Sequence, residues 1–278
     1  DFKANGATIE TIAGWTALFG YPDEPPMSLG EMEADPLSGL QMAAHTLVAL
    51  EHRARTGHGQ RIDGSMFEAA AGYIGEEILL AQTSADQPHP RGNRDRAMAP
   101  QGAFPCLGLD SWIAITVRDD RDWRALLGVA GEASQLRDPR FATAAGRLAL
   151  VEAVEAAVAA WTATQDAREL MSRLQAAGVP AGVVLKTDEV PHDSHIQARG
   201  WFRPLDHPDL GTHLYNGYPW RFARSPLAWG VPPPRIGEHS AAVLAERLGI
   251  GDEKYERLVA AGVTGATLEW PDEVEAGR

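Results

Sequence analysis

The sequence predicts an α/β protein, in which helices and strands alternate along the chain. Apolar residues recur at helical spacing in several long segments, and short runs rich in β-branched and aromatic residues lie between them. Turns that contain Gly or Pro separate these segments. Strands that alternate with helices are typical of the α/β class.

The first part of the chain contains three predicted helices and one short strand. The longest helix is predicted from apolar residues at helical spacing, namely Leu37, Leu40, Ala44, Leu47 and Val48. Asp35-Pro36 marks its start, since Asp caps helices and Pro suits the first helical position. The predicted elements are a helix over 7–20 that ends at Gly20, a Pro-rich loop over 21–33, a helix over 36–55, a turn over 56–59, a strand over 60–65 and a helix over 66–82.

The remaining chain contains a second block of helices and strands and a final block rich in Pro and Trp. A long loop over 83–105 precedes the second block. The elements predicted after this loop are a strand over 111–117, a helix that starts within 122–127, helices over about 147–162 and 166–177, and a strand over 183–185. We assign no element between about residue 200 and Gly237, and two helices, over about 240–248 and 252–261, close the chain.

Composition limits the classes of function. The 278 residues can bury a substantial core and allow one or two domains. A net charge of −13 argues against a nucleic-acid or membrane-surface partner. No apolar run has the length of a membrane span, and no basic-then-apolar signal segment is present. The single cysteine, Cys106, excludes an internal disulfide and fits a reducing cytoplasm, where we expect it to be a core residue.

Metal binding is not predicted. No HExxH motif and no paired cysteines occur in the sequence. His192 and His195 have the spacing of two ligands on one helix face, but they lie in a polar segment without a nearby third ligand. We therefore expect neither a metal nor a redox cofactor.

An arginine-containing loop is a candidate binding segment. Arg91, Arg94 and Arg96 lie within six residues of one another in a strongly acidic protein. Guanidinium groups suit carboxylates and phosphates because they offer planar, bidentate donors. The alternative is a solvated loop with exposed ion pairs to Asp86 and Asp95, and the residues alone do not separate the two interpretations.

Asp35 has two interpretations that local sequence leaves open. As the residue before Pro36 it suits an N-cap. A carboxylate at a helix N-terminus is also held ionised by the helix dipole and by exposed N–H groups. Such a carboxylate can attack an acyl centre and form a covalent intermediate.

Short blocks along almost the whole chain carry a resemblance to a known family. They cover residues 5–10, 20–26, 34–40, 49–53, 56–60, 62–69, 91–93, 99–102, 138–141, 177–180 and 237–239, and include Ala34-Asp35-Pro36-Leu37-Ser38-Gly39-Leu40 and Arg91-Gly92-Asn93. In identity and order these blocks resemble the class III CoA transferases, the CaiB–BaiF family.

The resemblance implies that Asp35 is the catalytic carboxylate of a CoA transferase. In that family the carboxylate attacks an acyl-CoA thioester, expels CoA thiolate and forms an aspartyl–acyl mixed anhydride. CoA returns through an aspartyl thioester and passes to the incoming carboxylic acid. CoA is thus a substrate, and the partners are an acyl-CoA and a small carboxylic acid. The expected N–H donors to the oxyanion are those of the helix N-terminus.

Two departures from the family pattern narrow this expectation. The racemase branch places a histidine roughly thirty residues before the aspartate, where this chain has Asn5, so an acyl-CoA racemase or isomerase is the alternative within the family. The oxalate-type members carry a run of glycines that closes over the intermediate, and this run is absent from residues 93–102. The residues expected to contact an anionic acceptor or the CoA phosphates instead are Arg91, Asn93, Arg94, Arg96 and Gln101.

The third departure concerns the large domain. Family members begin with a segment that supplies the first part of a Rossmann-like large domain, and we expect this segment to be missing here or supplied by another chain. The family plan assigns 1–90 and 196–278 to the large domain and 91–195 to a smaller α/β domain, and it implies an interlocked homodimer. The alternative from another class is a non-catalytic subunit or fragment that serves binding or assembly.

Overall fold

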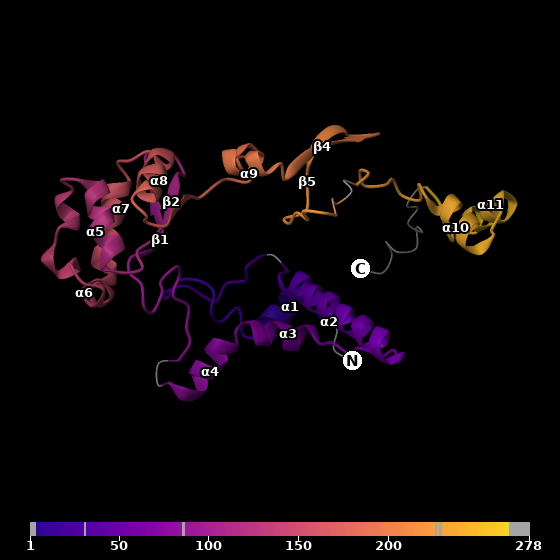
Figure 1. The fold of residues 1–278 in the computed structure, drawn as a ribbon, viewed down its shortest axis with the longest axis horizontal. Coiled ribbons are helices and arrows are strands. Elements are labelled where there is room, and N and C mark those ends of the chain that lie inside the picture. The colour runs from indigo at the N-terminus through magenta and orange to yellow at the C-terminus, as the bar shows by residue number, and fades with distance from the viewer. Residues whose placement is uncertain (1–3, 31, 85–86, 226, 228–229, 267–278) are drawn as a thin grey trace, which may run out of the picture. The chain divides into compact units, whose positions relative to one another are not determined.

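The computed structural model describes residues 4–30, 32–84, 87–225, 227 and 230–266 (Figure 1). Contacts within the chain define two units, Asp1–Val184 and Leu185–Arg278. Both β-sheets of the described residues are antiparallel, and helices accompany them in a mixed α/β fold. Parallel strand pairs of a Rossmann-like domain do not occur in this described part, and that domain stays a prediction.

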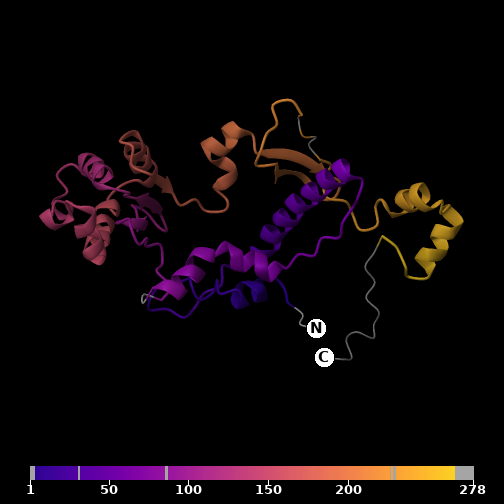
Figure 2. The same ribbon diagram turned by 60° about the horizontal axis from the view of Figure 1, so that its bottom comes forward.

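The N-terminal part of the first unit consists of helices that pack around a small cluster (Figures 1 and 2). They are α1 (Gly6–Ile12), α2 (Ala34–Thr56) and α3 (Met66–Tyr73), and α4 (Gly75–Thr83) follows α3 outside this cluster. Buried Trp15 lies at the centre of the cluster, beside Ala34 and Ala70, and its indole Nε1 donates a hydrogen bond of 2.9 Å to the carbonyl oxygen of Ala70. This cluster therefore fixes the start of α2 against α1 and α3.

Three predictions in this part are corrected. The helix predicted over 7–20 ends at Ile12, because Gly14 adopts a φ of +95° that no helix can contain. The strand predicted over 60–65 is absent, since no partner strand pairs with this extended segment among the described residues. The helix predicted over 66–82 is interrupted at Ile74, whose φ of −100° and ψ of 26° are not helical.

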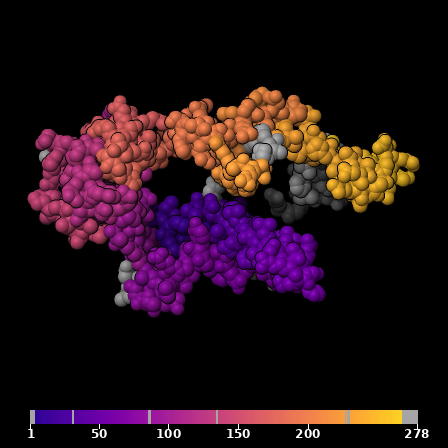
Figure 3. Space-filling view, in the orientation of Figure 1, coloured from indigo at the N-terminus to yellow at the C-terminus, as the bar shows by residue number. Residues whose placement is uncertain are grey.

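The predicted long helix exists, but its apolar residues are not buried. Leu40, Leu47 and Val48 are 68%, 67% and 64% exposed, and Ala34 is the one buried residue of α2. In Figure 3 this helix lies in the part of the surface that is coloured indigo to violet. Helical spacing thus predicted the element correctly, although the described chain does not cover its apolar face.

The main hydrophobic core lies in the second half of the first unit. Strands β1 (Gln101–Pro105), β2 (Trp112–Thr116) and β3 (Ala181–Val183) form a sheet in the order β1-β2-β3. Buried Ile113 and Ile115 alternate with exposed neighbours on β2, so one face of the sheet points into the core. The helices that cover this core are α5 (Asp120–Ala130), α6 (Ala144–Ala149), α7 (Val151–Thr162) and α8 (Ala167–Ala176), with short 3₁₀ turns at Ser134–Leu136 and Pro139–Phe141.

Element boundaries in this half also differ from expectation. Strand β1 lies inside the loop predicted over 83–105, because Gly102 and Pro105 weaken its strand signal. Strand β3 occupies 181–183 instead of 183–185, since it pairs with Ile113–Ile115 of β2. The single helix predicted over 147–162 is two helices that meet at Leu150.

The second unit contains a hairpin and small helices. They are a 3₁₀ turn (Val190–His192), α9 (Ser194–Arg199), β4 (Phe202–His207), β5 (Gly211–Asn216), α10 (Ser240–Leu248) and α11 (Asp252–Ala260). The two final helices are confirmed, whereas the β4–β5 hairpin occupies a segment to which no element was assigned. Between residues 185 and 266, no described residue is buried. None of the helices the structure describes has the length and apolarity to cross a membrane.

Candidate active site

Asp35 occupies the first turn of α2 and not its cap. The helix begins at Ala34, so Asp35 is its second residue, and Glu33 stands at the cap position without a side-chain cap bond. The expectation that Asp35 is the N-cap is therefore wrong by two positions. Its side chain is exposed at the N-terminal end of the helix.

The N–H groups of this first turn are already hydrogen-bonded. Ala34 N donates to Glu10 Oε1 at 3.2 Å, Asp35 N donates to Met32 O at 3.1 Å, and Leu37 N donates to Glu33 O at 3.1 Å. Pro36 has no N–H to offer. The N–H groups expected to serve as oxyanion donors at this helix N-terminus are therefore already engaged within the chain.

Helix α1 lies directly against Asp35. A Cβ built on Gly6 would overlap Asp35 Oδ2 and would lie 3.2 Å from Asp35 Cγ. The neighbouring Asn5, which stands at the racemase histidine position, caps α1 by accepting a hydrogen bond of 3.1 Å from Thr8 N. The residue at the racemase histidine position is thus an asparagine that caps α1.

The binding candidates gather around one cavity. Arg91, Asn93, Arg94 and Gln101 line a cavity of ≈ 750 Å³ together with residues 21–24, 102–105 and part of α7. Two hydrogen bonds shape its wall: Gln101 Nε2 donates to Asn93 O at 3.2 Å, and Gly92 N donates to Gly20 O at 2.8 Å. Asp35 is not among the residues that line this cavity. Arg96 lines a neighbouring cavity of ≈ 320 Å³.

Two arginines of the loop form internal ion pairs. Arg94 donates to the carboxylate of Glu155 at 2.8 and 3.1 Å, and this hydrogen bond raises the pKa of the Arg94 guanidinium. Arg96 pairs with Glu77 of α4 at 3.0 Å. Four carboxylates, those of Asp23, Glu24, Glu152 and Glu155, line the same cavity as Arg91 and Arg94. The expected positive patch is therefore largely compensated.

Arg94 and Arg96 of the loop form ion pairs, and neither pairs with Asp95, one of the two expected partners. Asp95 accepts backbone hydrogen bonds from Ala97 N at 2.7 Å and Met98 N at 3.1 Å, which closes a turn. Asp86 lies outside the described residues. The actual partners, Glu77 and Glu155, come from α4 and α7, so the two arginines hold the loop between elements that are distant in sequence.

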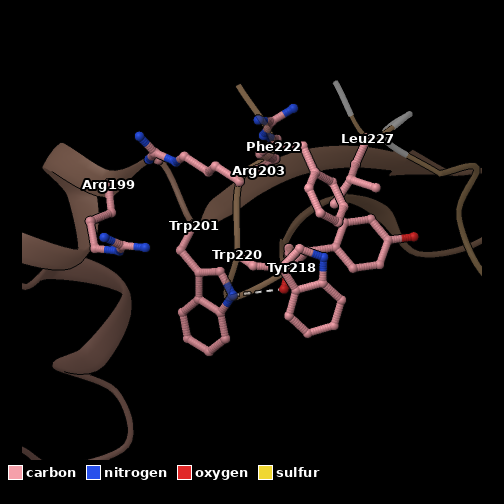
Figure 4. Close-up of a pocket in the computed structure, with 10 residues that line it drawn as sticks. Arg199, Trp201, Arg203, Tyr218, Trp220, Phe222 and Leu227 are labelled. Carbon is pink, nitrogen blue, oxygen red and sulfur yellow. Dashed lines mark hydrogen bonds between the residues drawn. The ribbon is translucent and has the colours of Figure 1, made fainter. Parts of the chain in front are cut away.

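A further cavity of ≈ 300 Å³ lies in the second unit, beside the β4–β5 hairpin (Figure 4). Trp201 Nε1 donates to Gly217 O at 2.7 Å, and the rings of Tyr218 and Trp220 pack at 5.7 Å between centroids. Arg199, Arg203 and Arg221 stand at its edge. The segment is rich in Trp, but no local pattern in the sequence indicates a cavity there.

Cys106 and the acidic and histidine side chains complete the description of the predicted residues. Cys106 is buried in the main core as expected, and burial raises the pKa of its thiol. Among the described residues, no group of three His, Cys, Asp or Glu side chains is arranged to hold a metal ion.

The fold has relatives among solved structures. A CaiB/BaiF family protein from Brucella suis superimposes with a TM-score of 0.75 and 29% identity, covering 87% of this chain and 62% of that one. The mixed α/β fold is therefore that of CaiB/BaiF proteins. The chain matches CoA-transferase family III over residues 1–240 and belongs to that family. The resemblance seen in the sequence is confirmed.

Curated relatives transfer CoA between different acids. The chain is 28% identical to the formyl-CoA:oxalate CoA-transferase of Streptomyces avermitilis, over 95% of this chain and 68% of the relative. It is 29% identical to the succinyl-CoA–D-citramalate CoA-transferase of Chloroflexus aurantiacus, over 93% and 64% respectively. It is 28% identical to the succinate–glutarate CoA-transferase of Agrobacterium fabrum, over 88% and 61%. The chain thus spans about two-thirds of the length of these relatives.

Proposed function

We propose that this chain takes part in CoA transfer between an acyl-CoA and a small carboxylic acid, with Asp35 as the nucleophile. The observation that carries the proposal is the exposed Asp35 carboxylate in the first turn of α2, within a chain of CoA-transferase family III. Relatives named for oxalate, citramalate, succinate and glutarate, which all carry two carboxylates, support a small dicarboxylic acid as the acceptor class.

The proposed reaction proceeds through two kinds of covalent intermediate. An Asp35 carboxylate oxygen attacks the thioester carbon, the C–S bond breaks, and CoA leaves as a thiolate with the electron pair. The thiolate then attacks Cγ of the aspartyl–acyl anhydride, which releases the first acid as its carboxylate and leaves an aspartyl thioester. The incoming carboxylate reverses both steps with its own acyl group and frees Asp35. No proton is gained or lost in the cycle, so no general acid or base is required.

The loop residues divide into two roles in this proposal. Arg91, Asn93 and Gln101 provide polar contacts to the substrate from the cavity wall. Arg94 and Arg96 hold the loop in place through Glu155 and Glu77. The cap role of Asn5 favours transfer over racemisation, because two-base proton exchange lacks its second partner there.

The assembly is also a proposal. We infer a homodimer with residues 1–90 and 196–278 in a large domain and 91–195 in a smaller one, located in the cytoplasm. The exposed apolar side chains of Leu40, Leu47 and Val48 support an interface on α2, since exposed apolar patches mark association surfaces.

The first test traps the aspartyl intermediate. The protein is incubated with succinyl-CoA and hydroxylamine, which converts the intermediate into an aspartyl hydroxamate that peptide mass spectrometry locates. We expect the adduct at Asp35, and we expect Asp35→Ala to lower CoA exchange by at least about 10³-fold. Asp252→Ala is the matched control, because Asp252 is an exposed first-turn aspartate of α11 and should leave exchange unchanged.

Two results would contradict the proposal. CoA exchange by Asp35→Ala at the wild-type rate would exclude Asp35 as the nucleophile. Deuterium wash-in at the acyl α-carbon without CoA exchange would instead favour the racemase alternative.

A further inference from the structure

A buried carboxylate on α1 holds the start of α2. Glu10 is 2% exposed, and its Oε1 accepts the hydrogen bond of 3.2 Å from Ala34 N, one residue before Asp35. Burying a carboxylate is costly unless it is hydrogen-bonded. This contact satisfies an N–H that the first turn of a helix leaves without an intrahelical acceptor. Glu10, from another helix, thus provides the side-chain cap that Glu33 at the cap position does not provide.

The same face of α1 also leaves room for the Asp35 carboxylate. Gly6 precedes Glu10 by four residues, so the two share one side of the helix. Any side chain at Gly6 would overlap Asp35 Oδ2. Gly6 has no unusual φ, so its lack of a side chain serves this close approach and not a turn. One residue therefore fixes the backbone beside Asp35, and the other leaves space for its side chain.

We propose that Glu10 is a positioning residue for Asp35 and that Gly6 is the surface on which the Asp35 carboxylate rests. The inference rests on the proposed function of Asp35 as nucleophile. The hydrogen-bond acceptor of Glu10, and not its negative charge, sets the position of Ala34 and through it the direction of the Asp35 side chain. Attack on a thioester requires an oxygen at near-contact distance and in the correct orientation, so a small displacement of Asp35 lowers the rate strongly.

Substitutions at Glu10 separate acceptor from charge. Glu10→Gln keeps a carbonyl oxygen at the acceptor position, whereas Glu10→Ala removes it. We expect adduct formation with succinyl-CoA and hydroxylamine to fall by about 10-fold or more in Glu10→Ala, with the half-saturating succinyl-CoA concentration unchanged, and to stay within about threefold in Glu10→Gln.

Substitution of Gly6 tests the same contact from the other side. Gly6→Ala forces away both the Asp35 carboxylate and Met32, whose Cβ lies 2.6 Å from an added Cβ, and we expect about a 10²-fold loss of adduct formation. Gly128→Ala is the matched control, because Gly128 lies within helix α5 and has no atom within 4 Å of an added Cβ. It should react like the wild type.

A second readout does not depend on activity. Exposed carboxylates are labelled with a water-soluble carbodiimide and glycine ethyl ester, and the labelling rate of each residue is measured by peptide mass spectrometry. In Glu10→Ala we expect the rate at Asp35 to change by at least about threefold while Asp63 and Asp252 keep their rates. General destabilisation of the first unit would instead also raise the labelling rate of Asp122, which is buried in the folded state.

The outcomes distinguish this inference from the proposed function. If the wild type forms the Asp35 adduct and Glu10→Ala matches it in both adduct formation and Asp35 labelling, the positioning role is wrong and the nucleophile stands. If the wild type forms no Asp35 adduct, the proposed function fails, and labelling alone decides whether Glu10 sets the geometry of Asp35. A parallel rise in the labelling of Asp35 and of buried Asp122 overturns the positioning role in either case.

Discussion

Gly92 shows how one missing side chain shapes the candidate binding loop. Its φ is +61°, and an added Cβ would lie 2.7 Å from Cδ1 of Tyr21. Gly92→Ala would therefore strain the backbone and place the new Cβ against the Tyr21 ring. We expect it to lower the free energy of unfolding by about 2–3 kcal/mol. Gly57→Ala is the control: its φ is +78° with no atom within 4 Å, so only the strain of about 1–2 kcal/mol remains. Chemical denaturation of both variants measures the difference, and equal losses would show that the Tyr21 ring gives way freely.

Local sequence predicted where the Asp35 helix lies but not how its start is held. Asp35-Pro36 marked the region of the helix start correctly, yet the helix begins at Ala34. The reason is tertiary, since Glu10 satisfies the Ala34 N–H from another helix. The signal that was missed is a carboxylate between Ile9 and Ile12 on a face that otherwise carries apolar residues. Contacts across twenty-four residues of sequence are invisible to local rules.

At the scale of elements, an ion pair fixes the turn between β2 and α5. Asp122 of α5 is buried, and Arg118 donates to its two oxygens at 2.6 and 3.0 Å. The side-chain hydrogen bond from Arg118 lowers the pKa of Asp122. Because the folded-state pKa lies below the unfolded one, this stabilisation is fully present above the usual Asp pKa of about 4 and is lost as the pH falls through the folded value.

This geometry predicts a pH-dependent effect of substitution. Asp122→Asn should lower the free energy of unfolding by about 2 kcal/mol at pH 7, and the difference from wild type should shrink below about pH 4. Asp63→Asn is the control, since its pair with Arg61 is fully on the surface and is worth less than about 0.5 kcal/mol. Denaturant titrations between pH 3 and 7 check this, and a constant difference across that range would contradict the assignment.

Elements with strong periodicity were predictable, as was the apolar strand β2, whereas the short strands that contain Pro or Gly were not. Helices α2, α10 and α11 lie where apolar spacing and Gly stops place them. Strand β1 and the β4–β5 hairpin were missed because each is only five or six residues long and contains Pro or Gly. Their formation depends on the neighbouring strand, and a pattern within one segment does not contain that partner.

At the scale of the whole molecule, buried residues concentrate in one part of the chain. Sixteen buried residues form the main core around β1–β3, α5, α7 and α8. The described residues of the second unit contribute none. Backbone amides exchange slowly where opening requires the disruption of a core, so local stability should differ sharply between the two units.

Hydrogen exchange measures this difference. We expect amides of Ile113 and Ile115 in β2 to exchange at least about 10²-fold more slowly than paired amides of the β4–β5 hairpin. Amides of α7 serve as the reference for a helix that packs on the core, and those of α10 for one without buried residues. Comparable protection in β2 and in the hairpin would show that the second unit is stabilised by contacts beyond those described.

At this scale the sequence alone indicated the family. It did not indicate which charged side chains line the cavity around Arg91 and Arg94. Short blocks in a fixed order span most of the chain, and order over a long distance is far more specific than any one block. The same sequence placed Arg91, Arg94 and Arg96 in one loop, yet it did not show that α7 brings Glu152 and Glu155 to the same cavity. Which charges meet depends on how helices pack, and charge counting along the chain does not contain this information.

The buried guanidinium of Arg147 fixes one end of the candidate binding loop to the core. From α6 it donates to Ala99 O at 2.8 Å, to Phe141 O at 3.0 Å and to Asp120 at 3.0 Å, and it stacks over Trp123 at 5.3 Å. The hydrogen bond to Ala99 O fixes this part of the loop to the core. Nearer its start, the loop is held by the hydrogen bond from Gly92 N to Gly20 O. Arg94 and Arg96 add the ion pairs to Glu155 and Glu77 between these two points, so the segment from Gly92 to Ala99 is anchored along its length and presents Asn93 from a fixed backbone.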